Sequence, residues 1–289
     1  MTSRIALVTG ANQGIGLALA TGLAARLDPD DLVVLSGRDA ARVARAAAGV
    51  AGAAATRSRV EGRVLDVSDA AAVAGLAAEL AERHGGLDVV VTNAAARIVP
   101  DRPPEEQIDE FVAVGNGGAN AVLRSFGPVL RPGGRLIVVA SSLGTLDQLD
   151  PSLHHLFDGV PLAAVEATVE AWRTAVHAGT AREQGWPAWI NVPSKVAQVA
   201  AVRAVAAERR AEDLAAGTLV AAVCPGLVDT PASRPWFDDF SRALTPEQAA
   251  GRVLDFVLRP DVDPATYGEL VRSGRVVPWR SGTPAVPRH

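Results

Sequence analysis

The 289-residue sequence lacks several features, and each absence excludes a class of protein. A single cysteine, Cys224, excludes a disulfide framework and any metal site built from several cysteines. No uninterrupted apolar run reaches about 18 residues, and the charged Arg4 directly precedes the first short apolar run, so neither a membrane span nor a signal peptide is predicted. A net charge of -4 without clusters of Lys or Arg argues against a nucleic-acid or anionic-membrane surface. We therefore expect a cytoplasmic protein that binds neither nucleic acids nor membranes, and we expect no metal.

Lysine and tyrosine each occur once, as Lys195 and Tyr267, although Lys and Arg together number 28. Aromatic residues make up only 4% of the chain, so the core must consist mainly of Ala, Val and Leu, and five of the few aromatics are tryptophans. With 48% hydrophobic residues, the chain has enough apolar material for one large core.

Short β-branched runs alternate with longer Ala-rich stretches, which indicates βαβ units and a parallel sheet. The runs are continuously apolar, so helices should cover both faces of the sheet. We predict an α/β fold with a Rossmann-type, doubly wound parallel sheet of about seven strands. The predicted strands cover 4–9, 32–36, 63–65, 87–92, 134–140, 218–223 and 269–271. The predicted helices cover 15–27, 39–48, 69–84, 116–130 and 194–213, and a further helix opens at Thr245.

The interval between Ser142 and Lys195 breaks this alternation. It holds apolar residues at loosely helical spacing, several prolines and three of the five tryptophans. A structureless loop of this length is rare inside a compact domain, so we predict a helical insertion over 143–190. The whole of 1–280 is predicted to be one domain, followed by a flexible tail over 281–289.

A glycine-rich segment follows the first predicted strand and runs directly into the first predicted helix. Glycines permit a tight turn and the close approach of a pyrophosphate, whose charge is favoured by free N–H groups at a helix N-terminus. The position between strand and helix supplies the context that such a motif requires. We predict a dinucleotide site whose phosphate-binding loop includes Gly10, Asn12, Gln13, Gly14, Ile15 and Gly16.

The residue that ends the second strand distinguishes between the two nicotinamide dinucleotides. A carboxylate there would bind the adenosine ribose, whereas a basic residue would meet a 2'-phosphate. Arg38 stands at this position and favours NADP(H). Asp39 is the competing possibility, but it is better placed to cap the next helix.

The ends of the third and fourth strands contribute further candidates for cofactor contacts. Asp66 and Val67 are placed to meet the adenine, although Asp66 also fits as a plain turn residue. Asn93 and Ala94 are expected to line the floor of the cofactor site.

Together these motifs resemble the short-chain dehydrogenase/reductase family, from Arg4 to about Trp279. The glycine loop is similar to that family's TGxxxGxG pattern, Asn93 and Ala94 to its NNAG element, and 224–230 to its PGxVxT segment. The resemblance implies that this last segment closes over the nicotinamide through Pro225, Gly226, Val228 and Thr230. The insertion resembles that of the carbonyl-reductase branch, where inserted helices cover the surface used for tetramer formation, which implies a monomer.

The family's active site combines a Ser with a Tyr and a Lys that lie four residues apart on one helix face. The resemblance assigns the Ser to Ser142, with Ser141 as the alternative, and the Lys to Lys195, which would hold the nicotinamide ribose. The family's structural Asn is carried onto Asn116, which keeps the family spacing, rather than onto Asn120. A single ammonium in a chain that otherwise uses Arg supports the role of Lys195, because a planar guanidinium could not replace it.

Asn191 stands four residues before Lys195, where the family has its Tyr. Tyr267 shares no predicted helix with Lys195, so we do not expect it to take that role. An Asn side chain donates hydrogen bonds but no proton, so Asn191 would act electrostatically on developing charge. We predict an NADP(H)-dependent oxidoreductase that reduces an activated C=N, C=C or C=O group of a small organic substrate without a Tyr acid.

Three alternatives stay open from the sequence. Another acid acting through water would be one of His154, His155, Glu166 and Glu170, each of which also fits as a surface residue. The scaffold would also suit redox-neutral chemistry, such as dehydration, cyclisation or isomerisation, or catalytically silent NADP(H) binding. The aromatic residues either form a substrate pocket or pin the insertion to the core; they are Trp172, Trp186, Trp189, Trp236 and Phe237.

Overall fold

The computed structural model describes residues 3–281, so nearly all of the predicted tail lies outside the described residues. Eight strands form one sheet in the order β3-β2-β1-β4-β5-β6-β7-β8. All neighbouring strands are parallel except β7 and β8, which are antiparallel. The strands are β1 Ile5–Val8, β2 Leu32–Gly37, β3 Arg59–Val64, β4 Leu87–Thr92, β5 Leu130–Val139, β6 Leu219–Val223, β7 Leu270–Arg272 and β8 Arg275–Val277. The predicted doubly wound sheet is confirmed, and β8 adds a short antiparallel strand at its edge.

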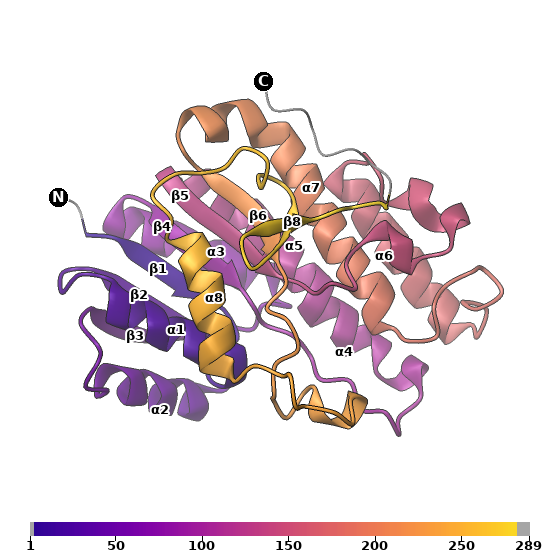
Figure 1. Cartoon of the computed structure of the whole chain (residues 1–289), viewed down its shortest axis with the longest axis horizontal. Helices are drawn as coiled ribbons and strands as arrows, with labels where there is room; N and C mark the ends of the chain where they lie inside the picture. The colour runs from indigo at the N-terminus through magenta and orange to yellow at the C-terminus, as the bar shows by residue number, and fades with distance from the viewer. Residues whose placement is uncertain (1–2, 282–289) are drawn as a thin grey trace.

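Helices cover both faces of the sheet (Figure 1). On one face α1 packs against α2 and α8, and on the other α5 packs against α3 and α7, with α6 outside α7. The α-helices are α1 Gly14–Arg26, α2 Ala40–Ala51, α3 Ala70–His84, α4 Ile108–Val112, α5 Gly118–Phe126, α6 Leu162–His177, α7 Asn191–Ala215 and α8 Pro246–Val257. Within residues 3–281 no helix is long and apolar enough to cross a membrane.

Side-chain caps fix the start of three helices at the positions that the sequence predicts. The Asp39 carboxylate accepts from the Arg42 N–H and begins α2, and the Asp69 carboxylate accepts from two N–H groups in the first turn of α3. Thr245 and Gln248 form a reciprocal capping box at the start of α8. These caps satisfy N–H groups that have no partner within the helix.

Three predicted elements have the wrong bounds. The third strand, predicted at 63–65, occupies Arg59–Val64, because an edge strand is paired on one side only and tolerates the polar, half-exposed sequence RVEGRV. The helix predicted at 116–130 ends at Phe126, and a π-helical turn at Ala113–Gly117 joins it to α4. The next strand accordingly starts early, at Leu130.

The interval over 143–190 contains one α-helix, α6, and two short 3-10 segments, at Leu146–Gln148 and Pro151–Leu156. Trp172 and Trp186 are buried there with their ring centroids 6.1 Å apart. These two tryptophans therefore pin the insertion to the core and line no substrate pocket.

The strand order places the functional crevice. Because β1 lies between β2 and β4, consecutive connections leave in opposite directions from the carboxyl ends of β1 and β4. Ligands of open α/β sheets bind at such a switch point, where two loops diverge and leave a gap. The loops after β1 and β4 are therefore the frame of the site.

Candidate active site

The glycine loop is clamped against the loop after β4. The Thr9 hydroxyl accepts from the backbone N–H groups of Asn93 (3.0 Å) and Ala94 (3.2 Å), and the Asn93 amide donates to the Gly10 carbonyl (3.2 Å). A Cβ at Gly16 would lie only 2.3 Å from the Gly10 carbonyl oxygen, so any side chain there would force the loop apart. Asn93 thus holds the glycine loop against the loop after β4.

The N-terminus of α1 is open to an anion. Its N-cap residue, Gln13, makes no capping hydrogen bond with its side chain. Gly14 has φ +55°, a left-handed conformation that favours glycine, and no atom lies within 4 Å of the place where its Cβ would be. Free N–H groups, the helix dipole and open space together fit a dinucleotide pyrophosphate.

Basic side chains lie beside the carboxyl end of β2. The Arg38 guanidinium donates to the Glu110 carboxylate at 2.6 Å, and both side chains are exposed. The Arg42 guanidinium donates to the Gln13 side chain and so reaches the glycine loop. Arg42 is absent from the residues predicted from the sequence, although it stands on α2 only four residues after Arg38. Asp39 caps α2, as expected.

Asp66 and Val67 follow β3. The Asp66 carboxylate accepts from the Ser68 hydroxyl at 2.7 Å and from the Ser68 N–H at 3.0 Å, and these hydrogen bonds lower the pKa of Asp66. This is the turn role that the sequence left open. Val67 is buried against Gly118, where a Cβ would come within 2.6 Å of the valine side chain.

A cavity of about 470 Å³ lies at the carboxyl ends of the strands, and most of its wall is apolar. It brings together residues from the ends of β4, β5 and β6 and from the first turns of α7. The predicted site residues that line it are Ile15, Ser142, Asn191, Lys195, Gly226, Val228 and Thr230. Gly10, Asn12, Gln13, Gly14, Gly16, Arg38, Asp66, Val67, Asn93, Ala94, Pro225 and Asn116 do not line this cavity.

Lys195 is held by a residue that the sequence pattern did not single out. Its ammonium donates to the Gln198 side-chain oxygen at 2.8 Å, and the Gln198 amide donates to the Gly115 carbonyl at 2.6 Å. Gly115 belongs to the π-helical turn, so Gln198 bridges α7 to that turn. Burial lowers the pKa of Lys195 to about 8. The sequence offers one indication of this role: Gln198 is a polar residue, three positions after Lys195, on a helix face otherwise built of Val and Ala.

Asn116 is buried in the same π-helical turn. Its amide donates to the Ser194 carbonyl at 3.0 Å, and its side-chain oxygen accepts from the Ser194 hydroxyl at 2.8 Å. Asn116 therefore positions the residue directly before Lys195. It fixes the first turns of α7 together with Gln198.

Tyr267 lies far from this cavity. Its hydroxyl donates to the Asp213 carboxylate at 2.6 Å, and Arg209 makes two hydrogen bonds to the same carboxylate. Asp213 is near the last turn of α7, about 33 Å along the helix from Asn191 at 1.5 Å per residue. Burial and the neighbouring carboxylate raise the pKa of Tyr267, so this phenol is a structural group.

The other candidate acids also lie outside the cavity lining. Glu166 pairs with Arg124, Glu170 pairs with Arg173, and the His154 ring contacts the Leu149 carbonyl. His155 is exposed on a 3-10 segment. Among the described residues that line the cavity there is no Asp, Glu, His or Tyr.

A parallel sheet with a glycine loop at its switch point and a cavity beside it defines a Rossmann-type dinucleotide-binding protein. The family model described as short chain dehydrogenase matches residues 4–150, and the chain belongs to this family of oxidoreductases.

Known proteins similar to this chain include two carbonyl reductases. Carbonyl reductase (NADPH) 1 of Sus scrofa is 30% identical over 287 residues, which cover 96% of this chain and 94% of the relative. Carbonyl reductase (NADPH) 3 of Mus musculus is 31% identical, covering 96% and 99%. The structure of salutaridine reductase from Papaver somniferum has the same fold, with a TM-score of 0.76 at 22% identity, covering 92% of this chain and 99% of that one.

The position of Tyr267 predicts the effect of its removal. Tyr267→Phe should lower the free energy of unfolding by about 1–3 kcal/mol, because the buried Asp213 loses one donor. Urea denaturation monitored by circular dichroism measures this change. The titration of Lys195 should stay the same in this variant, because the two residues lie near opposite ends of α7; a shifted titration would contradict the structural role.

The pKa of Lys195 can be measured directly because the chain has only one lysine. With ¹³C-labelled lysine, the side chain should give one NMR signal that titrates near pH 8 instead of its ordinary 10.5. Above that pH the half-buried ammonium becomes a neutral amine. In Gln198→Glu a carboxylate would face the ammonium, so the midpoint should move upward. A wild-type midpoint near 10.5 would contradict the burial of Lys195.

Proposed function

We propose that this protein is an NADPH-dependent reductase of an activated C=N, C=C or C=O group in a small organic substrate, and that it works without a tyrosine acid. The observation that carries the proposal is the composition of the 470 Å³ cavity. Ser142, Asn191 and Lys195 line it, whereas none of its lining residues is an Asp, Glu, His or Tyr. The chemistry would therefore need little help from a carboxyl, imidazolium or phenol acid of the protein.

The choice of NADP(H) rests on the residues around the glycine loop. The open N-terminus of α1 fits the pyrophosphate, and Arg38 and Arg42 offer guanidinium groups for a 2'-phosphate. The names of the two carbonyl reductases reported above specify NADPH. When bound, the cofactor supplies or accepts a hydride.

Each polar residue of the cavity then has a role. The Lys195 ammonium, held by Gln198, would bind the nicotinamide ribose, and Asn116 would keep that turn of α7 in place. The Ser142 hydroxyl and the Asn191 amide would donate hydrogen bonds to the substrate atom on which negative charge develops. The segment that contains Pro225, Gly226, Val228 and Thr230 would close over the nicotinamide.

The missing acid selects the substrate. A positioned general acid contributes roughly 10²- to 10⁴-fold in rate, which corresponds to about 3–5 kcal/mol of barrier. An iminium ion already carries its proton, and a conjugated enone spreads charge onto an oxygen that Ser142 and Asn191 would reach. Either substrate avoids most of the loss, whereas a simple ketone suffers all of it.

A substrate panel tests the proposal against its alternatives. NADPH oxidation should be measured by absorbance with simple ketones, conjugated enones and cyclic imines. Oxidation with enones or imines that is roughly 10² times or more faster than with ketones supports the proposal. Tight NADPH binding without oxidation would indicate a silent binder, and substrate conversion without NADPH consumption would indicate redox-neutral chemistry.

Asn191→Tyr tests whether the missing phenol is the main defect. The introduced phenol would stand one helical turn before Lys195, so ketone reduction should rise by about 10-fold or more. Asn191→Phe is the control, because it adds the same ring without the hydroxyl. Equal ketone reduction by both variants would show that the site lacks more than a proton donor.

Gly16→Ala tests the cofactor loop. The new Cβ would overlap the Gly10 carbonyl oxygen, so NADPH affinity, measured by fluorescence titration, should fall by about 10-fold or more. Gly75→Ala on α3 is the matched control, because no atom lies within 4 Å of its Cβ position. Unchanged affinity in Gly16→Ala would argue against cofactor binding at this loop.

We also expect the protein to be a cytoplasmic monomer. The helix α6 of the insertion packs against α4 and α7 and so covers a face that the carbonyl-reductase resemblance associates with tetramers in shorter proteins. Light scattering during size-exclusion chromatography would report the mass directly.

A further inference from the structure

The cavity has an unbalanced charge. Its lining contains three basic side chains, from Arg97, Lys195 and Arg272, and no carboxylate, although the whole chain carries a net charge of -4. Lys195 is accounted for by its proposed contact with the cofactor ribose. The two guanidinium groups have no role in the proposed chemistry.

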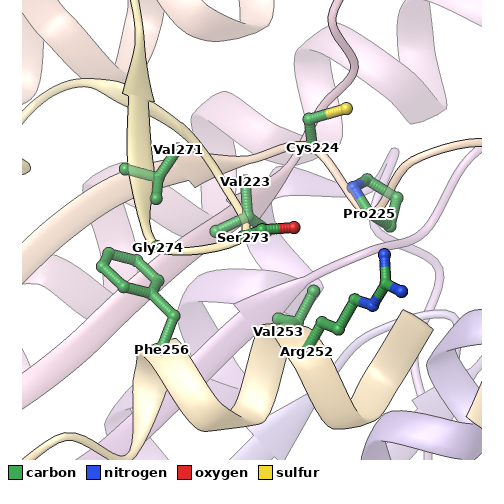
Figure 2. Close-up of a pocket in the computed structure, with 9 residues that line it drawn as sticks. All are labelled: Val223, Cys224, Pro225, Arg252, Val253, Phe256, Val271, Ser273 and Gly274. Atoms are coloured by element: carbon green, nitrogen blue, oxygen red, sulfur yellow. The ribbon is translucent and has the colours of Figure 1, made fainter. Parts of the chain in front are cut away.

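The hairpin of β7 and β8 determines which way the Arg272 side chain points. Its neighbours Val271 and Ser273 line a separate cavity of only about 10 Å³, together with Val253 and Phe256 of α8 (Figure 2). Successive side chains of a strand point to opposite sides, so Arg272 faces away from α8 and lines the large cavity instead. The small cavity has room for a water at most.

No carboxylate neutralises either guanidinium within residues 3–281. Arg272 makes no ion pair or side-chain hydrogen bond with a described residue, and one of its nitrogens lies 4.0 Å from the Cβ position of Gly226, in the segment that follows β6. Arg97 donates only to the Pro231 carbonyl. By contrast, Arg234, in the loop after β6, pairs with Asp229. Arg272 thus presents a guanidinium without a carboxylate partner at the cavity, which offers a site for an anion.

Aromatic side chains form another part of the cavity wall. The rings of Trp189 and Trp236 lie 5.4 Å apart between centroids with an interplanar angle of 32°, and both line the cavity. Trp189 comes from the insertion and Trp236 from the 3-10 segment Arg234–Trp236 after β6. Phe237 lines the cavity beside them. This wall suits a flat apolar group.

We infer that the substrate is an organic carboxylate with an apolar, preferably aromatic, body. Arg272 would bind the carboxylate, while Trp189 and Trp236 contact the body. A guanidinium binds a carboxylate through two parallel hydrogen bonds, which provides both affinity and orientation. The inference rests on the proposed reductase function, because it names the substrate class of the same cavity.

A binding experiment tests the anion site without turnover. The probes are phenylacetate and the neutral phenylacetamide, titrated calorimetrically into the NADP⁺-loaded protein. Phenylacetate should bind at least about 10-fold more tightly than phenylacetamide. The Arg272→Gln substitution should lower the affinity for phenylacetate by roughly 10- to 100-fold. Arg275→Gln is the matched control. Arg275 stands opposite Arg272 in the register of the same hairpin, but it does not line the cavity.

A kinetic experiment connects the anion site to the reaction. The substrates are 4-oxo-4-phenylbut-2-enoate and its methyl ester, whose C=C bond would take up a hydride from NADPH and a proton from solvent. The wild-type protein should prefer the acid over the ester by about 10-fold or more in kcat/KM, and Arg272→Gln should remove this preference.

The outcomes separate the inference from the proposed function. Equal binding of the two probes, or an acid preference that survives in Arg272→Gln, would overturn the inference. So would a loss of NADPH affinity in Arg272→Gln that matches the loss of phenylacetate affinity, because Arg272 would then serve the cofactor. Charge-selective binding of phenylacetate without oxidation of NADPH by any substrate would leave the anion site standing and refute the reductase.

Discussion

The site depends on the contact between two loops that the sheet brings face to face. The Thr9 hydroxyl, after β1, accepts hydrogen bonds from the backbone N–H groups of Asn93 and Ala94, after β4. The Asn93 side-chain amide donates to the Gly10 carbonyl. Position 16 accommodates only glycine, because a Cβ there would overlap the Gly10 carbonyl oxygen. This contact fixes the positions of the two loops that border the crevice, and with them the orientation of the N-terminus of α1.

A second set of contacts fixes the chemical groups relative to that crevice. The π-helical turn before α5 provides the Gly115 carbonyl to Gln198 and the Asn116 side chain to Ser194. These three hydrogen bonds reach α7 on either side of Lys195, and Gln198 in turn accepts from the ammonium. Such buried networks are rigid when they are complete. Lys195 is therefore poised by residues that do not themselves need to touch a substrate.

The same network limits how protons move. Gln198 is an amide and hands no proton onward, and the cavity lining contains no carboxylate, imidazole or phenol. Burial lowers the pKa of Lys195, which lines the cavity, to about 8. Under the proposed function, Asn191 at the start of α7 would orient and polarise the substrate, while Gln198 holds Lys195. The reaction class proposed above follows from that limit.

Much of the architecture could be read from residues that are close together in the sequence. The apolar runs predicted most of the strands, Asp39, Asp69 and Thr245 predicted helix starts through local hydrogen bonds, and the glycine loop predicted a dinucleotide site. The predicted position of the third strand is wrong because the prediction relied on continuous apolar runs. An edge strand such as β3 does not need one.

The sequence by itself determined that Asn191 stands four residues before Lys195, and that the only tyrosine is remote along the chain. Tertiary structure alone decided that Tyr267 is bound to Asp213 at the far end of α7, that Gln198 holds Lys195, and that Arg272 shares a cavity with Ser142. Spacing along one helix is fixed by its 3.6-residue period, so sequence can give it. Contacts between residues tens of positions apart depend on how strands and helices pack, which no local pattern specifies.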